Sequence, residues 1–320
     1  MAFTDFFCIG FQKCGTSTLY ELLNKHPEVV LCQDVKEPMY YRVRGLRPVF
    51  GKGFYEHRYF GHVPEGDTRL KGEVNAGLTY TTCADKIGKD FGPDAKLIFM
   101  MREPVSRSYS AYKYFLARGF LTKNDYETDA KYGHAKGFDI YAHKILDNTR
   151  RRAKIMKKRL KYLVFSQSQY AQCIREYLAY FPKENMKFIL FEDFTKDQHK
   201  SCREIYDFIG IDDNNDVPYG LHVNEYNGKA VSANWATGLL LMKGINYLLY
   251  EFLWFKKRFP KLYDAFHKKF LYVREHSMEP DNDKDPVLPE TRKYLNAYYE
   301  PMVRDLEEIT GFDLKEVWGI

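Results

Sequence analysis

The chain has 320 residues and a formal net charge of +6 at pH 7, with 45% hydrophobic and 29% charged residues. This composition is typical of a globular protein and argues against extended disorder. The small basic excess suits a protein that handles anions, but it is too small to indicate nucleic-acid binding, so we expect no nucleic-acid partner.

The cysteine pattern and the N-terminal residues bear on the cellular compartment in which the protein is expected. The six cysteines form no C-x-x-C pair, so neither a disulfide framework nor a zinc site is expected. The first residues lack a signal-peptide pattern, and no stretch reaches the roughly 18 apolar residues of a membrane span. We therefore expect a cytoplasmic protein, unless a leader segment is missing from the sequence.

Short apolar strands alternate with helices over the first two thirds of the chain. Strands are expected at residues 6–9, 29–31, 69–74, 96–101 and 186–191. Helices are expected after residue 15, from about residue 104, and at 168–181 and 196–209, whereas residues 42–68 read as loop. This alternation predicts an α/β fold with a parallel sheet covered by helices on both faces.

The last third of the chain has a different character. We expect one domain over residues 1–320, with a core at about 6–210 and a helical C-terminal extension at about 211–320. An apolar, aromatic helix is expected at 235–255, and a final amphipathic helix at 291–310. The aromatic helix, followed by three basic residues, could contact a membrane surface peripherally, although core packing or a dimer face explains it better. The sequence leaves the oligomeric state open.

Residues 10–17, G-F-Q-K-C-G-T-S, follow a predicted strand and open a predicted helix, which is the context of a phosphate-binding loop. The glycine spacing imitates the nucleoside-triphosphate motif G-x-x-x-x-G-K-[ST], but Thr16 stands in the lysine's place and the lysine is Lys13. A kinase needs its lysine at the later position to reach the terminal phosphates. The displacement argues against ATP or GTP chemistry, but not against binding a nucleotide 5′-phosphate.

A second anion-binding segment follows the clearest strand of the chain. Arg102 ends that strand, and Ser110 lies eight residues later on the helix that begins near Pro104. A strand-end arginine and a serine two helical turns along can both bind one phosphate group.

These two segments resemble those of sulfotransferases that use 3′-phosphoadenosine 5′-phosphosulfate (PAPS). Residues 13–17 are similar to the family's 5′-phosphosulfate loop, and residues 97–110 are similar to its 3′-phosphate segment, R-[DE]-P with a serine eight residues after the arginine. The resemblance spans about residues 6–210, including a helix–strand unit at 168–194, and implies a P-loop-like sheet. The most similar branch is the carbohydrate sulfotransferases, with the heparan sulfate group and its bacterial relatives.

The resemblance implies PAPS as the sulfuryl donor, PAP as the product and no metal ion. It assigns a catalytic role to Lys13, which would stabilise the leaving phosphate. Arg102 and Ser110 would hold the 3′-phosphate, and Lys229 is a candidate second contact to the nucleotide. The 5′ end of the donor would be held by Lys13, Cys14, Gly15, Thr16, Ser17 and Thr18.

For the general base the resemblance points to Glu37. It lies in K-E-P-M-Y-Y at residues 36–41, which is similar to the [KN]-E-x-x-[FY]-[FY] segment of the carbohydrate branch. Lys36, beside it, is a candidate acceptor-binding residue. His26 and His57 are rival bases, because the phenol and steroid branch uses a histidine, but neither lies in that branch's motif.

Residues 72–80 follow a strand and should border the acceptor. They are imperfectly similar to the family's G-E-x-[ST]-P-x-Y segment and supply Glu73 and Asn75 as candidate acceptor-binding residues. Val74 stands where the heparan sulfate enzymes carry a lysine, and Ala76 stands in place of the proline. These departures weaken a heparan-type acceptor and leave the nucleotide site unaffected.

The expected activity is sulfuryl transfer from PAPS to a hydroxyl or amine of a carbohydrate acceptor. The alternatives are a sulfotransferase for a lipid or small metabolite and, in another class, a nucleotide kinase or a non-catalytic nucleotide-binding protein. Eight basic residues within 150–161 could form a rim for an anionic glycan or simply a solvated face.

Overall fold

A computed structural model describes residues 4–32, 34–43, 46–79, 83–118, 120–121, 125, 137–151, 160–223, 229–231, 258–276, 278–280 and 287–320. The chain divides into two compact units. The first comprises Met1–Arg107, Gln167–Glu225 and Ala297–Ile320, and the second comprises Ser108–Ser166 and Tyr226–Asn296. A single domain with a boundary near residue 210 stays a prediction, and residues on both sides of that boundary contribute to each unit.

The first unit is built on a five-stranded sheet in the order β2-β3-β1-β4-β5, in which every neighbouring pair is parallel. Phe6 pairs with Gly72 on one side and with Lys96 on the other, so β1 lies at the centre. The strands are β1 (Phe6–Cys8), β2 (Val29–Leu31), β3 (Leu70–Val74), β4 (Lys96–Met101) and β5 (Met186–Leu190).

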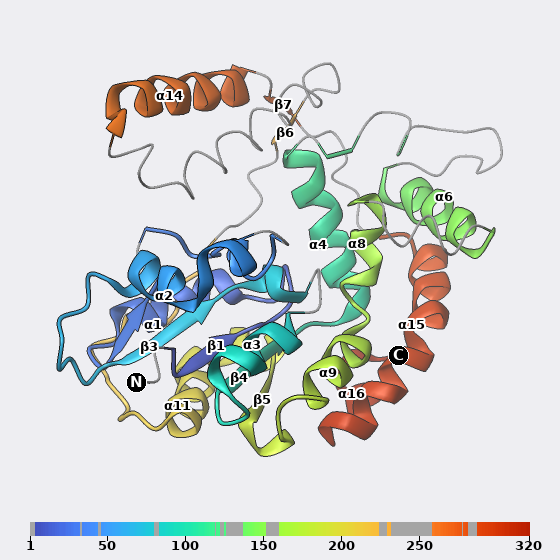
Figure 1. Cartoon of the computed structure of the whole chain (residues 1–320). Coiled ribbons are helices and arrows are strands. Elements are labelled where there is room, and N and C mark those ends of the chain that lie inside the picture. Colours follow the sequence, from blue (N-terminus) through green and yellow to red (C-terminus); the bar gives the residue numbers. More distant parts are fainter. Residues whose placement is uncertain are drawn as a thin grey trace. The chain divides into compact units, whose positions relative to one another are not determined.

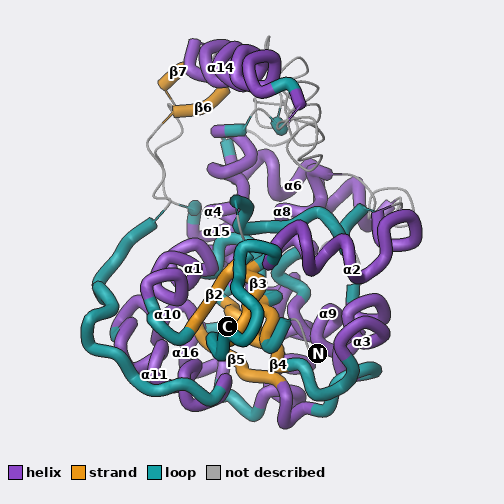
Figure 2. The backbone as a smooth tube through the Cα atoms, turned by 60° about the vertical axis from the view of Figure 1, so that its left-hand side comes forward, coloured by secondary structure: helices purple, strands orange, loops and turns teal. Residues whose placement is uncertain are grey.

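The central strands β1 and β4 are almost entirely apolar because helices cover both faces of the sheet. Figure 2 shows the strands between α1 (Thr16–Lys25) and α11 (Gln198–Ile209) on one side and α3 (Ala84–Phe91) and α9 (Tyr170–Leu178) on the other. All three residues of β1 and five of the six of β4 are buried. Burial on both faces explains these runs, since an alternating pattern would place polar side chains against the covering helices. The predicted α/β fold with a parallel sheet is therefore confirmed.

Helices complete the first unit, as Figure 1 shows. The further elements are α2 (Leu46–Phe60), α10 (Phe191–Lys196), α16 (Leu314–Trp318), and the short turns η1 (Ala76–Thr79) and η4 (Lys183–Asn185). The prediction that residues 42–68 are loop is wrong, because α2 occupies much of this segment. Its two halves meet at a kink where Gly51 has φ 68°. Pro48 and Gly53, which also suggested a loop, lie within three residues of that kink.

The second unit contains helices around an aromatic cluster. Its elements are most of α4 (Pro104–Ala117), α6 (Phe138–Arg151), η3 (Leu160–Tyr162), α8 (Leu163–Ser166), β6 (Lys229–Val231), α14 (Pro260–His276), β7 (Met278–Pro280) and the first part of α15 (Pro289–Thr310). The rings of Tyr112, Phe138, Tyr141 and Phe165 are buried and in contact. The helix expected at 235–255 lies outside the described residues.

Candidate active site

The loop after β1 is held by main-chain hydrogen bonds to the neighbouring strand β4. The N–H groups of Ile9 and Gly10 donate to the Ile98 carbonyl oxygen at 2.9 and 3.2 Å, and that of Phe11 donates to Met100. A Cβ atom at Gly10 would lie 2.8 Å from the Met100 nitrogen, so a side chain there would push the loop off the strand. Glycine is therefore required for this close backbone contact.

The loop then turns sharply into helix α1. Lys13 has φ 69° and Gly15 has φ 90°, both in the left-handed region, and α1 begins at the next residue. A Cβ atom at Gly15 would also lie 3.0 Å from the Phe191 ring. No side chain caps the N-terminus of α1, and its first turn carries no acidic residue. The first N–H groups of the helix are therefore left to bind an anion, aided by the helix dipole.

Lys36 links this helix terminus to the proposed base. Its Nζ donates to Ser17 Oγ at 2.8 Å and to Thr16 Oγ1 at 3.4 Å. The same Nζ lies 3.8 Å from Glu37 Oε1. Burial lowers the pKa of the Lys36 amine. The negative charge of Glu37 acts in the opposite direction but is the smaller effect. The lysine expected on the acceptor side therefore contacts the phosphate loop.

Glu37 lies between two cations at the edge of the first unit. Besides Lys36, the Arg42 guanidinium approaches Glu37 Oε2 to 3.9 Å, and 31% of the Glu37 side chain is exposed. The rings of Tyr40 and Tyr41, which follow in the same segment, are fully buried. The segment is thus anchored by its aromatic side chains while its carboxylate stays accessible, as a base that meets a substrate requires.

Glu73 and Asn75, expected to touch the acceptor, are both fully buried. Glu73 accepts hydrogen bonds from the Tyr55 hydroxyl at 2.5 Å and from the Asn75 amide at 2.7 Å. The same amide donates to the Pro38 carbonyl at 2.8 Å. Burial, with Glu73 beside it, raises the pKa of Tyr55 well above its usual value, so Tyr55 is a neutral donor. These contacts fasten the Glu37 segment to β3, and acceptor binding by Glu73 and Asn75 stays a prediction.

Arg102 directly follows β4 and is partly exposed. Its guanidinium lies 4.5 Å from the centre of the Phe191 ring, the same ring that packs against Gly15. Its carbonyl oxygen accepts a hydrogen bond from Tyr170 at 2.7 Å. Ser110 lies on α4 as expected, but in the second unit, so its joint role with Arg102 stays a prediction.

Arg107 was given no role by the sequence analysis, yet it is fully buried beside the phosphate loop. Its Nε donates to Ser168 Oγ at 2.5 Å, and its Nη1 donates to the Gln12 carbonyl at 3.5 Å. It therefore supports the main chain next to Lys13. The available signal was its position one turn into α4, where helical spacing turns a side chain back toward the preceding loop.

The start of α4 is fastened to the C-terminal helix α16. The Glu103 carboxylate accepts from the N–H groups of Val105 and Ser106 at 2.8 and 2.7 Å, which caps α4. Glu192 accepts from the Glu103 N–H at 2.9 Å and from the Trp318 indole at 3.2 Å. Residues near the end of the chain thus help to fix the segment that carries Arg102.

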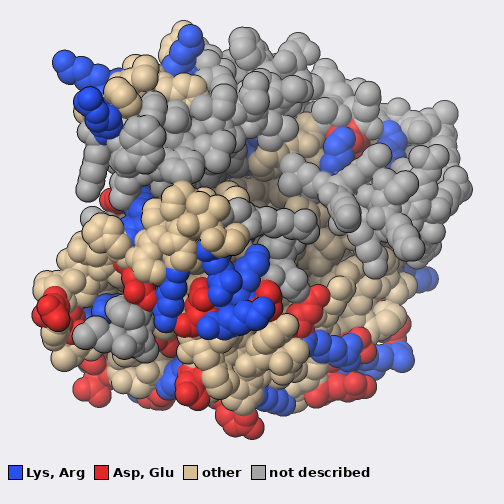
Figure 3. Space-filling view, viewed as in Figure 1, with Lys and Arg blue, Asp and Glu red and all other residues tan. Residues whose placement is uncertain are grey.

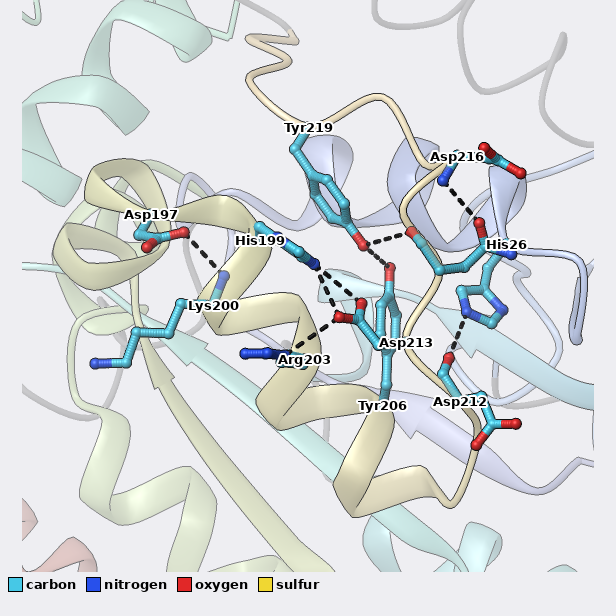
Figure 4. A network of polar contacts seen from close by, with 11 residues as sticks. His26, Asp197, His199, Lys200, Arg203, Tyr206, Asp212, Asp213, Asp216 and Tyr219 are labelled. Carbon is cyan, nitrogen blue, oxygen red and sulfur yellow. Dashed lines mark hydrogen bonds and ion pairs between the residues drawn. The ribbon is translucent and has the colours of Figure 1, made fainter.

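His26, one of the rival bases, is held in a network that Figure 4 shows. Its Nδ1 accepts from the Glu28 N–H at 3.2 Å, so the proton lies on Nε2, which is 2.9 Å from the Asp212 carbonyl oxygen. Only 2% of the residue is exposed. The His26 ring packs against the Tyr206 ring of α11, and the Tyr206 hydroxyl accepts a hydrogen bond from the Tyr219 hydroxyl. These contacts hold the segment after α11 against that helix. His26 is placed as a structural residue, whereas His57 is exposed on α2.

The chain after α11 returns to the phosphate loop. The Val223 N–H donates to Thr18 Oγ1 at 3.4 Å, and Gln198 binds the Gly220 and Leu221 N–H groups at 2.8 and 3.0 Å. Thr18 therefore already serves as an acceptor for the main chain. Lys229 is the first residue of β6 in the second unit, and its contact with the nucleotide stays a prediction.

Basic side chains on the α2 and α3 face are mostly paired with acids. Figure 3 shows Lys and Arg atoms beside Asp and Glu atoms there. Arg47 Nη2 lies 2.6 Å from Asp90 Oδ1, and Lys52 Nζ lies 3.8 Å from Glu56 Oε1. The basic run within 150–161 lies largely outside the described side chains, although Lys161 pairs with Asp125 at 2.6 Å.

Two further observations concern metal binding and membrane insertion in the described part of the chain. It holds no group of three or more His, Cys, Asp or Glu side chains that could bind a metal ion. None of its helices has both the length and the apolar character needed to cross a membrane.

Comparisons with known proteins agree with the geometry. Residues 3–237 match the family described as "Sulfotransferase domain". Carbohydrate sulfotransferase 15 of Mus musculus is 25% identical over 64% of this chain and 43% of its own length. Heparan sulfate glucosamine 3-O-sulfotransferase 3B1 of Mus musculus is 25% identical over 63% of this chain and 45% of its own length.

A sulfotransferase of Alicyclobacillus acidocaldarius has a similar fold, with a TM-score of 0.61 and 19% identity over 100% of both chains. The chain spans less than half of the length of the curated relatives above. Because the family match covers most of the chain, the chain belongs to the sulfotransferase domain family.

Proposed function

We propose that the protein is a PAPS-dependent sulfotransferase that modifies a hydroxyl or amine of a carbohydrate. The observation that carries the proposal is the turn at Lys13 and Gly15, which opens an uncapped helix with a lysine ahead of the glycine. This arrangement offers several N–H groups and one ammonium group to the 5′ end of a nucleotide.

The residues of the loop fit the 5′-phosphosulfate group. Gly15 is left-handed and a Cβ there would press on Phe191, so the absence of a side chain would let an anion approach the main chain at the start of α1. Lys13 would supply the positive charge, and the hydroxyls of Thr16 and Ser17 lie on the first turn of the helix. Arg102 and Ser110 would hold the 3′-phosphate.

The bound donor supplies a sulfuryl group, whose S–O bond to the 5′-phosphate breaks as a bond to the acceptor atom forms. Lys13 stabilises the charge that remains on the 5′-phosphate. Glu37 accepts the proton that the acceptor hydroxyl or amine loses. Positioning and charge stabilisation would supply most of the rate, as in phosphoryl transfer.

The carbohydrate acceptor is supported by the names of the two curated relatives and by the K-E-P-M-Y-Y segment that places Glu37 at an accessible edge. A lipid or small-metabolite acceptor is the second candidate. The position of Lys13 speaks against a kinase, since a triphosphate loop needs its lysine after the second glycine. The acceptor, a peripheral membrane contact and a cytoplasmic location all stay predictions.

Ligand-dependent unfolding tests the nucleotide class. PAP at 100 times its dissociation constant should stabilise the folded protein by about 2.7 kcal/mol, whereas ATP and GTP should not. Transfer of labelled sulfate from PAPS is then measured on desulfated heparan sulfate, chondroitin, a simple phenol and a sterol. Stabilisation by ATP or GTP alone would point to a kinase or nucleotide-binding protein. Transfer to the phenol or sterol alone would refute the carbohydrate acceptor.

A further inference from the structure

The contacts of Lys36 assign it to a different part of the site from its neighbour Glu37. Its Nζ is closer to Ser17 Oγ, at 2.8 Å, than to Glu37 Oε1, at 3.8 Å. Only 22% of its side chain is exposed. Lys36 is therefore held mainly against the first turn of α1 and reaches the carboxylate only as a longer ion pair.

The direction of these hydrogen bonds has a chemical consequence. An ammonium group has donors and no acceptor, so Ser17 Oγ and Thr16 Oγ1 must accept from Lys36. A hydroxyl that accepts in this way keeps its own proton for another partner. Among the described residues, the structure gives neither hydroxyl an acceptor for that proton.

Ser17 and Thr16 lie on the first turn of α1, whose N-terminus has no side-chain cap, so their protons are available to a ligand at that terminus. An anion bound there would receive hydroxyl donors that are already oriented and polarised by a neighbouring positive charge. Without Lys36, each hydroxyl could rotate and donate elsewhere, and the charge would be lost as well.

We propose that Lys36 is a positioning residue that sets Ser17 and Thr16 as hydrogen-bond donors to the anionic 5′ end of the nucleotide. The inference rests on the proposed function, because it needs a nucleotide at this loop. It differs from a role in acceptor binding, because its effect falls on nucleotide affinity. It also differs from simple pairing with Glu37, because it acts through two hydroxyl groups.

A double-mutant cycle on PAP binding tests the proposal by isothermal titration calorimetry. Lys36→Met keeps the length of the side chain without its charge, and Ser17→Ala removes the nearer hydroxyl. Lys36→Met should weaken PAP binding by about 10- to 100-fold, the range for a charged hydrogen bond. The double variant should bind PAP no more weakly than Lys36→Met alone, because the Ser17 hydroxyl is useful only while Lys36 orients it.

Two further variants separate orientation from general effects. Lys36→Arg retains a charged donor and should recover part of the lost affinity. Lys86→Met is the matched control. The Lys86 Nζ donates to the carbonyl oxygen of Tyr41, a residue of the Glu37 segment, at 2.9 Å, and it contacts neither the Ser17 nor the Thr16 hydroxyl. It should leave PAP affinity unchanged. Thermal unfolding of each variant verifies that it is folded.

Three results would overturn the inference. Losses that multiply in the double variant would show that Lys36 and Ser17 act independently. Unchanged PAP affinity in Lys36→Met, with a fall in turnover alone, would place Lys36 with Glu37 instead. Equal weakening in Lys36→Met and Lys86→Met would show a structural effect. Failure of the wild-type protein to bind PAP would overturn the proposed function itself, and the inference with it.

Discussion

The two sides of the candidate site are built in different ways. The phosphate loop is fixed by its own main chain, through hydrogen bonds to β4 and two left-handed residues. The Glu37 segment is fixed by buried side chains of other elements, since Asn75 binds the Pro38 carbonyl and Glu73 binds Tyr55. The proposed nucleotide side is therefore held largely through main-chain contacts, whereas the proposed acceptor side is held by side chains that are far apart in the chain.

Among the variants that distinguish the acceptor side from the nucleotide side, Glu37→Gln is expected to have the largest effect on turnover. This change keeps the shape and removes the basicity, so turnover should fall by about 10²–10⁴-fold, while PAP affinity stays nearly constant. Sulfate-transfer kinetics and calorimetry measure the two quantities.

Glu56→Gln is the control for Glu37→Gln, because Glu56 also has a lysine at 3.8 Å but lies on α2. Turnover within a few-fold of wild type in Glu37→Gln would place the base elsewhere. A collapse of PAP affinity would instead show that Glu37 holds the nucleotide loop.

Lys13→Ala should lower turnover by about 10²–10³-fold, because one preorganised donor to a developing charge is lost. The effect belongs to the nucleotide side, so the acceptor KM should change little. Lys25→Ala, at the other end of α1, is the matched control and should retain wild-type rates. A folded Lys13→Ala protein with near-normal turnover would contradict the role of Lys13.

Arg102→Ala should distinguish the two phosphates of the nucleotide. Binding of PAP should weaken by about 10- to 100-fold, whereas binding of adenosine 5′-phosphosulfate, which lacks the 3′-phosphate, should weaken much less. Competition titrations with both ligands measure the ratio. An equal loss for both would mean that Arg102 acts through its packing on Phe191.

Asn75→Ala should have the smallest effect and should act on the acceptor side. It leaves the Glu73 carboxylate and the Pro38 carbonyl with one donor fewer, so the free energy of unfolding should fall by about 1–3 kcal/mol. Urea denaturation measures this loss. Acceptor kinetics should worsen while PAP affinity is retained, and the reverse pattern would contradict the division between the two sides.

Sequence patterns predicted the elements around the proposed nucleotide side well, because apolar strands and tight turns leave local patterns. The apolar strands, the loop at residues 10–17 and the break before Pro104 all lie where expected. The family was also identified correctly from these segments.

The acceptor side was harder to predict for a physical reason. Whether Glu73 faces substrate or the core depends on Tyr55, which lies on α2, a helix that the sequence analysis missed. Arg107, which lies beside the loop on the other side of the candidate site, was also missed, because its partners Gln12 and Ser168 are distant in sequence. Neither contact leaves a periodic pattern.

The hydrogen bond from Trp318 to Glu192 also bears on biosynthesis. The first unit takes its last segment from Ala297–Ile320, after the second unit has been inserted twice. A ribosome must therefore deliver residue 318 before Trp318 can donate to Glu192, the residue that accepts from the Glu103 N–H at the start of α4. Until then, β1 and β4 can pair, but Glu192 lacks its Trp318 donor, so we expect the first unit to be completed later than a domain made from one continuous segment.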